Sequence, residues 1–153
     1  MIRLRRLALP LVSMLVLAAQ PALAEQPTRP VKVSGGEIAG TDDGRLRTYL
    51  GVPFAAPPVG ALRWRRPQPV VRWSGVRKTT AFSPACAQTA EWIANPKSED
   101  CLYLNVWAPA KARNLPVIVW IHGGGMYGGT AAVPLHNDAN AGAGWSKGTS
   151  DST

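Results

Sequence analysis

The chain has 153 residues, with 17 lysines and arginines against 9 acidic residues and a formal net charge of +8. A chain of this length can bury one modest hydrophobic core. Its basic excess would fit a nucleic-acid binder, but three of the arginines lie in a segment typical of an export signal, which argues against that class.

Residues 1–24 have the pattern of a cleaved secretory signal. MIRLRR supplies the positive end, LALPLVSMLVLAA an apolar core, and Ala-Leu-Ala at 22–24 a small-x-small cleavage site. A membrane anchor is the alternative, but the apolar run is too short to span a bilayer and is interrupted by a proline and a serine. We therefore predict cleavage after Ala24, a secreted or periplasmic product, and no stable membrane anchor.

The first elements after the signal are predicted to form an antiparallel meander. VKVSGGEIAG (31–40) alternates apolar and polar positions around Gly35-Gly36, as a hairpin or bent edge strand does. Asp43-Gly44 is a turn signal, and RLRTYLGV (45–52) is predicted to be the returning strand.

The proline-rich segment 53–69 predicts an ordered, extended loop, because proline removes backbone donors and fixes φ. Large apolar side chains are expected to pin this loop to the body of the protein: Phe54, Leu62, Trp64 and Trp73. Six basic residues cluster in and after it, and their interleaving with proline and tryptophan favours a solvated, ion-paired surface: Arg63, Arg65, Arg66, Arg72, Arg77 and Lys78.

The two cysteines, Cys86 and Cys101, are predicted to form a disulfide, because an even pair in an exported chain is normally oxidised. Such a bond would close a loop of about fifteen residues and stabilise the fold by roughly 3 kcal/mol on chain-entropy grounds. Two free buried thiols are the alternative.

Two stronger strands are predicted after the loop. CLYLNVWAP (101–109) alternates in character, and PVIVWIH (116–122) is mostly apolar, which fits a strand covered on both faces in an α/β sheet.

Gly123, Gly124 and Gly125 follow that apolar strand directly. Without Cβ atoms, such a run lets backbone N–H groups converge on one point, which suits the oxyanion of an acyl-transfer intermediate. A phosphate cradle is the competitor, but the Lys-Ser/Thr of a P-loop and a GxGxxG pattern are both missing. A plain tight turn is the third possibility.

Three segments in this order resemble the type B carboxylesterases, the family that includes the cholinesterases: GVPFAAPPVGALRWRRPQPVVRWSGV (51–76), SEDCLYLNVWAP (98–109) and VIVWIHGGG (117–125). The resemblance implies an α/β-hydrolase fold, with antiparallel edge strands leading into a central sheet. It also implies hydrolysis of small-molecule carboxylic esters through a Ser-Glu/Asp-His triad, with no metal or organic cofactor.

Carried over to this chain, the resemblance assigns the oxyanion N–H groups to Gly124 and Gly125 and matches Cys86–Cys101 to the family's first disulfide. The base of the family lies near its far C-terminal end, so His122 and His136 are expected to be structural. Cholinesterases place a cation-binding tryptophan in the disulfide loop. The loop is shorter here, and we expect packing or partial exposure for Trp92.

Gly144–Gly148 satisfies G-x-S-x-G, the pattern of a nucleophile elbow. The pattern requires a buried strand before it and a helix after it, and neither is predicted, so Ser146 is not assigned as the nucleophile.

Residues 25–129 are thus expected to be the N-terminal portion of the hydrolase domain, and 130–153 a tail outside the family. A frameshift would explain the tail. Residues 141–144 are Ala-Gly-Ala-Gly, and some DNA sequences that encode them would encode Leu-Ala-Arg-Ala if translated one base further on, which is close to a family segment. Without a nucleophile or triad, this truncated chain is expected to be inactive. Two alternatives are a non-catalytic binding or adhesion protein and a short secreted disulfide module or fragment.

Overall fold

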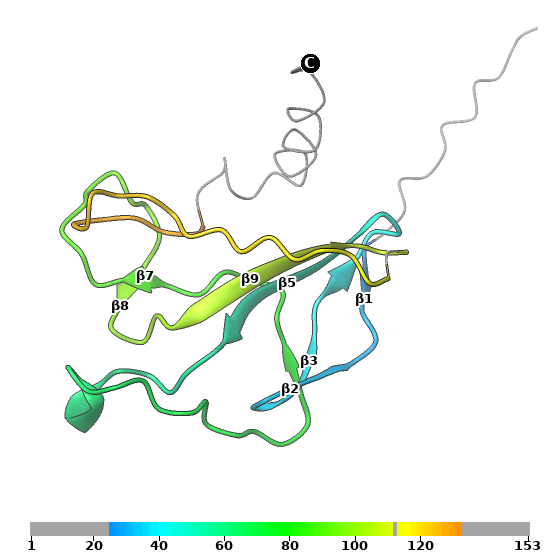
Figure 1. Cartoon of the computed structure of the whole chain (residues 1–153), viewed down its shortest axis with the longest axis horizontal. Coiled ribbons are helices and arrows are strands. Elements are labelled where there is room, and N and C mark those ends of the chain that lie inside the picture. The colour runs from blue at the N-terminus through cyan, green and yellow to red at the C-terminus, as the bar shows by residue number, and fades with distance from the viewer. Residues whose placement is uncertain (1–24, 112, 133–153) are drawn as a thin grey trace, which may run out of the picture.

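The computed structural model describes residues 25–111 and 113–132, which form a strand-rich body (Figure 1). The predicted signal at 1–24 lies outside the described residues, as do His136 and the 144–148 motif. Within the described ranges there is a single short 3-10 helix, η1 (Gly60–Leu62), and no helix there is long and apolar enough to cross a bilayer.

The largest sheet has four strands in the order β1-β4-β5-β9. It is built from β1 (Gln26–Pro27), β4 (Thr41–Asp42), β5 (Leu46–Pro53) and β9 (Tyr103–Pro109), and all its pairings are antiparallel. The strand predicted over 101–109 is therefore confirmed as β9, and the returning strand predicted over 45–52 is confirmed as β5.

The second sheet has three strands in the order β2-β3-β6. β2 (Val31–Val33) and β3 (Gly36–Ala39) form the hairpin predicted around Gly35-Gly36, and β6 (Val76–Lys78) pairs with β3 in parallel. A third, two-stranded parallel sheet joins β7 (Ala85–Cys86) to β8 (Lys97–Ser98) near the two ends of the disulfide loop.

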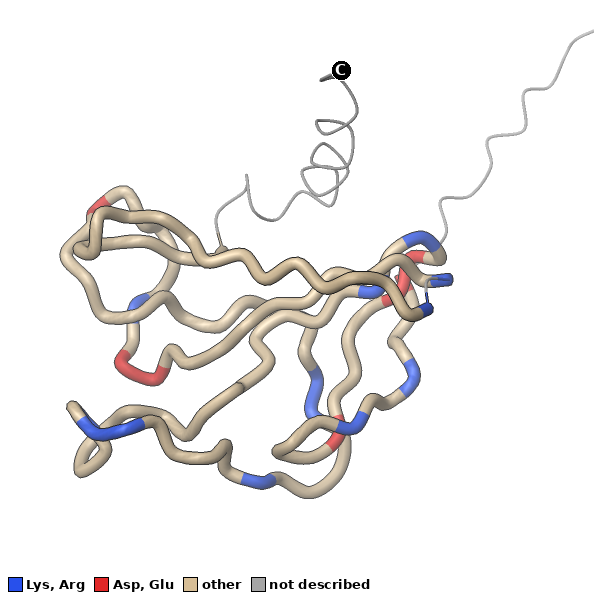
Figure 2. The backbone as a smooth tube through the Cα atoms, in the orientation of Figure 1, with Lys and Arg blue, Asp and Glu red and all other residues tan. Residues whose placement is uncertain are grey.

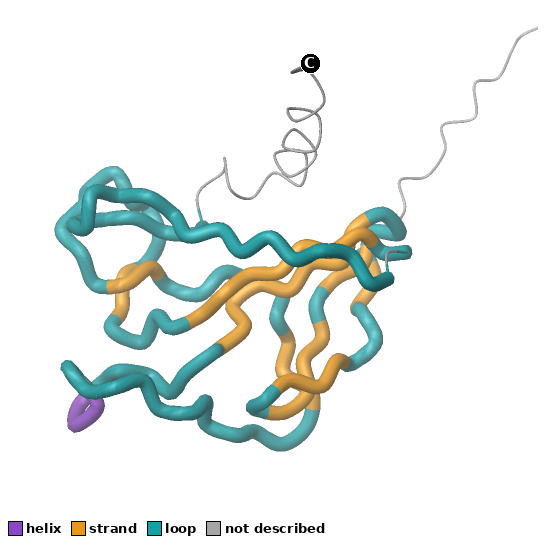
Figure 3. The backbone as a smooth tube through the Cα atoms, in the orientation of Figure 1, coloured by secondary structure: helices purple, strands orange, loops and turns teal. Residues whose placement is uncertain are grey.

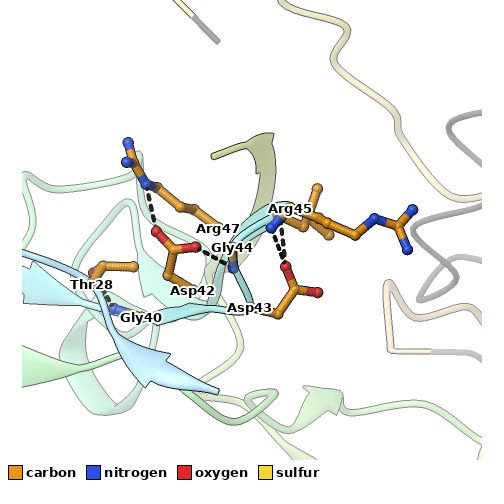
Figure 4. Close-up of polar contacts among 8 residues, drawn as sticks. Thr28, Gly40, Asp42, Asp43, Gly44, Arg45 and Arg47 are labelled. Atoms are coloured by element: carbon orange, nitrogen blue, oxygen red, sulfur yellow. Dashed lines mark hydrogen bonds and ion pairs between the residues drawn. The ribbon is translucent and has the colours of Figure 1, made fainter. Parts of the chain in front are cut away.

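The β4–β5 turn is held by two aspartates (Figure 4). Asp42 Oδ1 accepts the Gly44 N–H at 2.8 Å, and Asp43 Oδ1 accepts the N–H groups of Arg45 and Leu46 at 2.7 and 2.6 Å. Gly44 has φ +84°, a conformation that glycine adopts without a Cβ penalty. The Asp43-Gly44 turn prediction is thus confirmed, and its cause is local Asx hydrogen bonding.

The main hydrophobic core lies between the first two sheets, where Ile38, Tyr49 and Val52 are buried. Trp73 packs against this core, and its Nε1 donates to Glu37 O at 2.9 Å. Its ring also lies against Gly35, where any Cβ would overlap it. Trp73 therefore anchors the proline-rich segment, as predicted.

Two other predicted anchors are wrong. Trp64 is 95% exposed and Phe54 is 52% exposed, while Leu62 is half-buried. Trp64 also has φ +58°, in the turn that follows η1. All six clustered basic residues are exposed, as expected, and Arg63 pairs with Glu99 at 2.7 Å. In Figure 2 the basic positions are spread along the chain from one end of the molecule to the other.

The strand predicted over 116–122 is also wrong in the described structure. This segment is extended but belongs to no sheet there, and Figure 3 draws it as a loop. Val117 and Ile121 are 86% and 84% exposed. A strand needs a hydrogen-bonded neighbour, and within the described residues the four-stranded sheet ends at β9. The segment is extended, as a strand is, but neither the pairing nor the covering on both faces that the prediction requires is supplied by the described residues.

Candidate oxyanion loop and cleft

The glycine-rich segment 123–129 turns back on itself directly after the extended apolar segment. Gly124, Gly125 and Met126 have φ values of +146°, +60° and +67°, a left-handed run that glycine favours. Gly124 O accepts hydrogen bonds from the N–H groups of Tyr127 at 3.3 Å and Gly128 at 3.2 Å. A Cβ on Gly124 would overlap the carbonyl of Gly128, so this position accepts only glycine in the observed turn.

The N–H groups of Gly124 and Gly125 have no hydrogen-bond partner among residues 25–111 and 113–132. Gly124 is half-buried and Gly125 is exposed, and both line a cleft of about 590 Å³. Gly124 and Gly125, the donors predicted from sequence, are therefore adjacent cleft residues whose N–H groups have no partner in the described part of the chain.

The cleft is also lined by residues just before and within the disulfide loop and by residues of β9. They include Ser83, Cys86, Gln88, Tyr103 and Asn105. Cys86 and Cys101 form the predicted disulfide, with their Cα atoms 5.0 Å apart. The bond fixes the loop that follows β7 to the residue two positions before β9.

Tyr103 is the titratable group in the cleft with a perturbed acidity. Burial raises the pKa of its hydroxyl, and the nearby Asp100 carboxylate raises the pKa further by accepting a hydrogen bond and by its charge. Arg77 lies 5.8 Å from the Tyr103 ring centre and 5.5 Å from that of Trp73, so it stacks with both rings. The Tyr103 hydroxyl therefore stays protonated at neutral pH, where it can form hydrogen bonds but cannot act as a base.

The remaining sequence candidates have ordinary surroundings. His122 is exposed, and its Nδ1 lies 2.9 Å from Gly123 O. No hydrogen bond joins His122 to a serine or a carboxylate within the described part of the chain. Trp92 is 59% exposed, in agreement with the expected partial exposure. Among the described residues no group of His, Cys, Asp and Glu side chains is suited to hold a metal ion.

Gln88 is among the cleft residues that the sequence did not predict. Its side-chain amide hydrogen-bonds the backbone of Gly129, 41 positions later. No local pattern marks it, because glutamine between an alanine and a threonine is typical of any polar loop.

Comparisons with known proteins identify the family of the chain. The profile of the carboxylesterase family matches residues 27–140, more than half of the chain. Over 108 residues the chain is 44% identical to fumonisin B1 esterase of Sphingopyxis macrogoltabida, covering 67% of this chain and 20% of that protein. Over 108 residues it is 43% identical to acetylcholinesterase of Bungarus fasciatus, covering 62% and 18%.

Among solved structures, a PNB esterase superposes with a TM-score of 0.66 and 41% identity, over 71% of this chain and 23% of that chain. The chain thus spans about a fifth of the length of the curated relatives it matches. The likeness confirms the predicted α/β-hydrolase class, to which the described residues contribute antiparallel strands. From its sequence motifs, its fold and these matches, the chain belongs to the carboxylesterase family.

Proposed function

We propose that the protein hydrolyses carboxylic esters and that the N–H groups of Gly124 and Gly125 stabilise the oxyanion of the tetrahedral intermediate. The observation that carries this proposal is the pair of adjacent, unpartnered N–H groups on the cleft wall. When a nucleophile attacks an ester, the carbonyl oxygen gains negative charge, and one preorganised donor at that position is worth about 3 kcal/mol.

In a complete enzyme the chemistry would be divided between this part of the chain and others. The described residues supply the donors and line the cleft. Nucleophile, base and orienting acid belong outside them, since the only hydrogen-bond partner of His122 among the described residues is the neighbouring Gly123 carbonyl. We therefore propose that the described residues stabilise the oxyanion and supply none of the groups that make or break covalent bonds.

Export to an oxidising compartment is part of the same proposal. The described residues contain no free cysteine, and the Cys86–Cys101 bond is of the kind that persists outside the cytoplasm. The substrate is proposed only as a carboxylic ester, because the names of the relatives cover esters as different as fumonisin B1 and acetylcholine.

A chimera tests the donors. Residues 25–132 would replace the aligned part of the PNB esterase, which is 23% of that chain. We expect the chimera to hydrolyse p-nitrophenyl acetate and Gly124→Ala to lower its kcat by about 100-fold. Gly123→Ala is the matched control, because a Cβ there meets nothing within 4 Å.

A chimera that folds and is inactive would overturn the proposal and favour a non-catalytic, binding role for this chain. Equal kcat values for Gly124→Ala and Gly123→Ala would instead contradict the assignment of the oxyanion donors to Gly124 and Gly125. Folding is checked by circular dichroism and by the melting temperature of each variant.

A further inference from the structure

Gln88 stands out because its carboxamide makes three hydrogen bonds to backbone groups. Its Oε1 accepts the N–H of Gly129 at 2.6 Å, and its Nε2 donates to the carbonyl of Gly129 at 2.9 Å. Nε2 also donates to the carbonyl of Cys86 at 2.9 Å. A carboxamide carries the same donor and acceptor as a peptide group, so Gln88 pairs with Gly129 as a neighbouring strand residue would.

Gly129 is in turn packed against the start of the glycine loop. It has φ +148°, and a Cβ on it would overlap Gly123 O and the ring of His122. The loop is also closed from within by the two hydrogen bonds that Gly124 O accepts. Holding Gly129 therefore holds residues 123–125, because the two ends of the loop are in contact.

Gln88 itself is fixed to a rigid support. It lies two residues after Cys86. The disulfide joins Cys86 to Cys101, which lies two residues before the start of β9. Ala85, Ala90 and Ile93 form a small buried cluster beneath the same loop. Lys97 Nζ donates to Ala90 O at 2.8 Å and closes the loop on its other side.

We infer that Gln88 is a positioning residue for the Gly124 and Gly125 donors: it transfers the rigidity of the disulfide loop to the glycine loop through Gly129. This inference rests on the proposed function, since it explains what holds the oxyanion donors in place before substrate binds. Preorganised donors stabilise developing charge without reorganising during the reaction, which is why such a clamp matters. Gln88 is neutral and takes no part in proton transfer.

The test uses the full 153-residue chain and amide hydrogen exchange followed by NMR. Gln88→Ala and Gln88→Met remove all three hydrogen bonds, and Met preserves most of the side-chain volume. Both are expected to speed exchange of the Gly129 amide by about tenfold and to shift the amide signals of Gly124 and Gly125. Gln88→Glu keeps an acceptor for the Gly129 N–H and loses the donors. Its exchange rate at Gly129 should therefore lie between the native rate and the rates of Gln88→Ala and Gln88→Met.

The matched control is Gln68→Ala. The Gln68 side chain donates a single local hydrogen bond to Arg66 O, far along the sequence from the glycine loop. It should leave the exchange of Gly129 unchanged. A native exchange rate for Gly129 in both Gln88→Ala and Gln88→Met would overturn the inference. Equal acceleration across β5 and β9 would overturn it too, because that pattern reports general loss of stability.

A second measurement separates this inference from the proposed function. Phenylphosphonate, a tetrahedral anionic probe, is titrated into the native chain while the Gly124 and Gly125 amides are followed. A response of both amides that is lost in Gln88→Met supports donors and clamp together. Unresponsive amides in the native chain overturn the proposed donors, while the exchange of Gly129 still decides the role of Gln88.

Discussion

The backbone N–H of Gly51 donates a 2.9 Å hydrogen bond to the side-chain oxygen of Asn105, 54 positions later. Gly51 lies where the pairing of β5 with β9 is irregular, between Tyr49 and Val52, so its N–H is not used by the ladder. Asn105 supplies the missing acceptor and also lines the cleft. The Asn105 side chain therefore both pairs with the Gly51 N–H at the bulge and lines the candidate site.

Replacing Asn105 with leucine is expected to destabilise the chain by about 1–3 kcal/mol, because a part-buried donor loses its acceptor. Urea denaturation followed by tryptophan fluorescence measures the change. An unchanged midpoint would show that solvent satisfies the Gly51 N–H in the variant and that the hydrogen bond contributes nothing net.

Gly51→Ala is expected to be more harmful than Gly75→Ala, although both positions have similar φ values of +68° and +71°. Each variant pays about 1–2 kcal/mol for a left-handed residue with a Cβ. At Gly51 the new Cβ would also lie 2.8 Å from Ala81 O, whereas at Gly75 it meets nothing within 4 Å. Equal unfolding free energies for the two variants would contradict a steric role for the bulge.

Removal of the disulfide by a Cys86→Ser, Cys101→Ser double substitution is expected to cost about 3 kcal/mol, the value for a loop of this length. Thermal unfolding of the native chain with and without dithiothreitol should show the same loss. The double variant serves as the control, since its melting temperature should not respond to the reductant. A native chain that is also insensitive to reduction would contradict the prediction.

Acid should weaken the β4–β5 turn. Hydrogen bonding lowers the pKa of Asp42, through the Gly44 N–H and then Arg47, and lowers the pKa of Asp43, through the Leu46 and Arg45 N–H groups, in both cases from the ordinary value of 3.8. A carboxyl whose folded pKa is depressed stabilises the fold above its unfolded pKa and loses that contribution as pH falls through the folded value. The loss is therefore expected below about pH 3.8.

The measurement is the chemical shift of the Gly44 and Leu46 amides against pH in the native chain and in Asp42→Asn and Asp43→Asn. Each native amide should titrate below pH 3.8 with its own carboxylate. Each asparagine variant should abolish one transition and leave the other. A transition at or above the ordinary pKa would contradict the assigned hydrogen bonds.

Local turn chemistry explains why much of the fold could be predicted. The Gly35-Gly36 and Asp43-Gly44 turns carry their own backbone preferences and hydrogen-bond partners, so adjacent residues suffice to place β2, β3, β4 and β5. The disulfide needed only an even pair of cysteines and an export signal. The position of the glycine loop followed from the apolar run before it.

The features that could not be predicted depend on contacts between residues far apart in the sequence. The clamp at Gln88 joins residues 41 positions apart, and nothing near Gln88 specifies its partner. Trp64 and Phe54 were expected to be buried because they are large and apolar, but size does not say which surface is available to cover them. For 116–122 the apolar pattern indicates a strand without naming its neighbour, and the described residues supply none.

The exposed apolar segment has a consequence for how the chain behaves in solution. Residues 117–121, Val-Ile-Val-Trp-Ile, carry no charge and no proline and combine high β-propensity with high exposure. Short segments of this kind assemble into intermolecular sheets when they are left uncovered. We expect the purified chain to aggregate increasingly with protein concentration. Charged substitutions within 117–121 should then raise the solubility of the chain and leave the structure of the cleft unchanged.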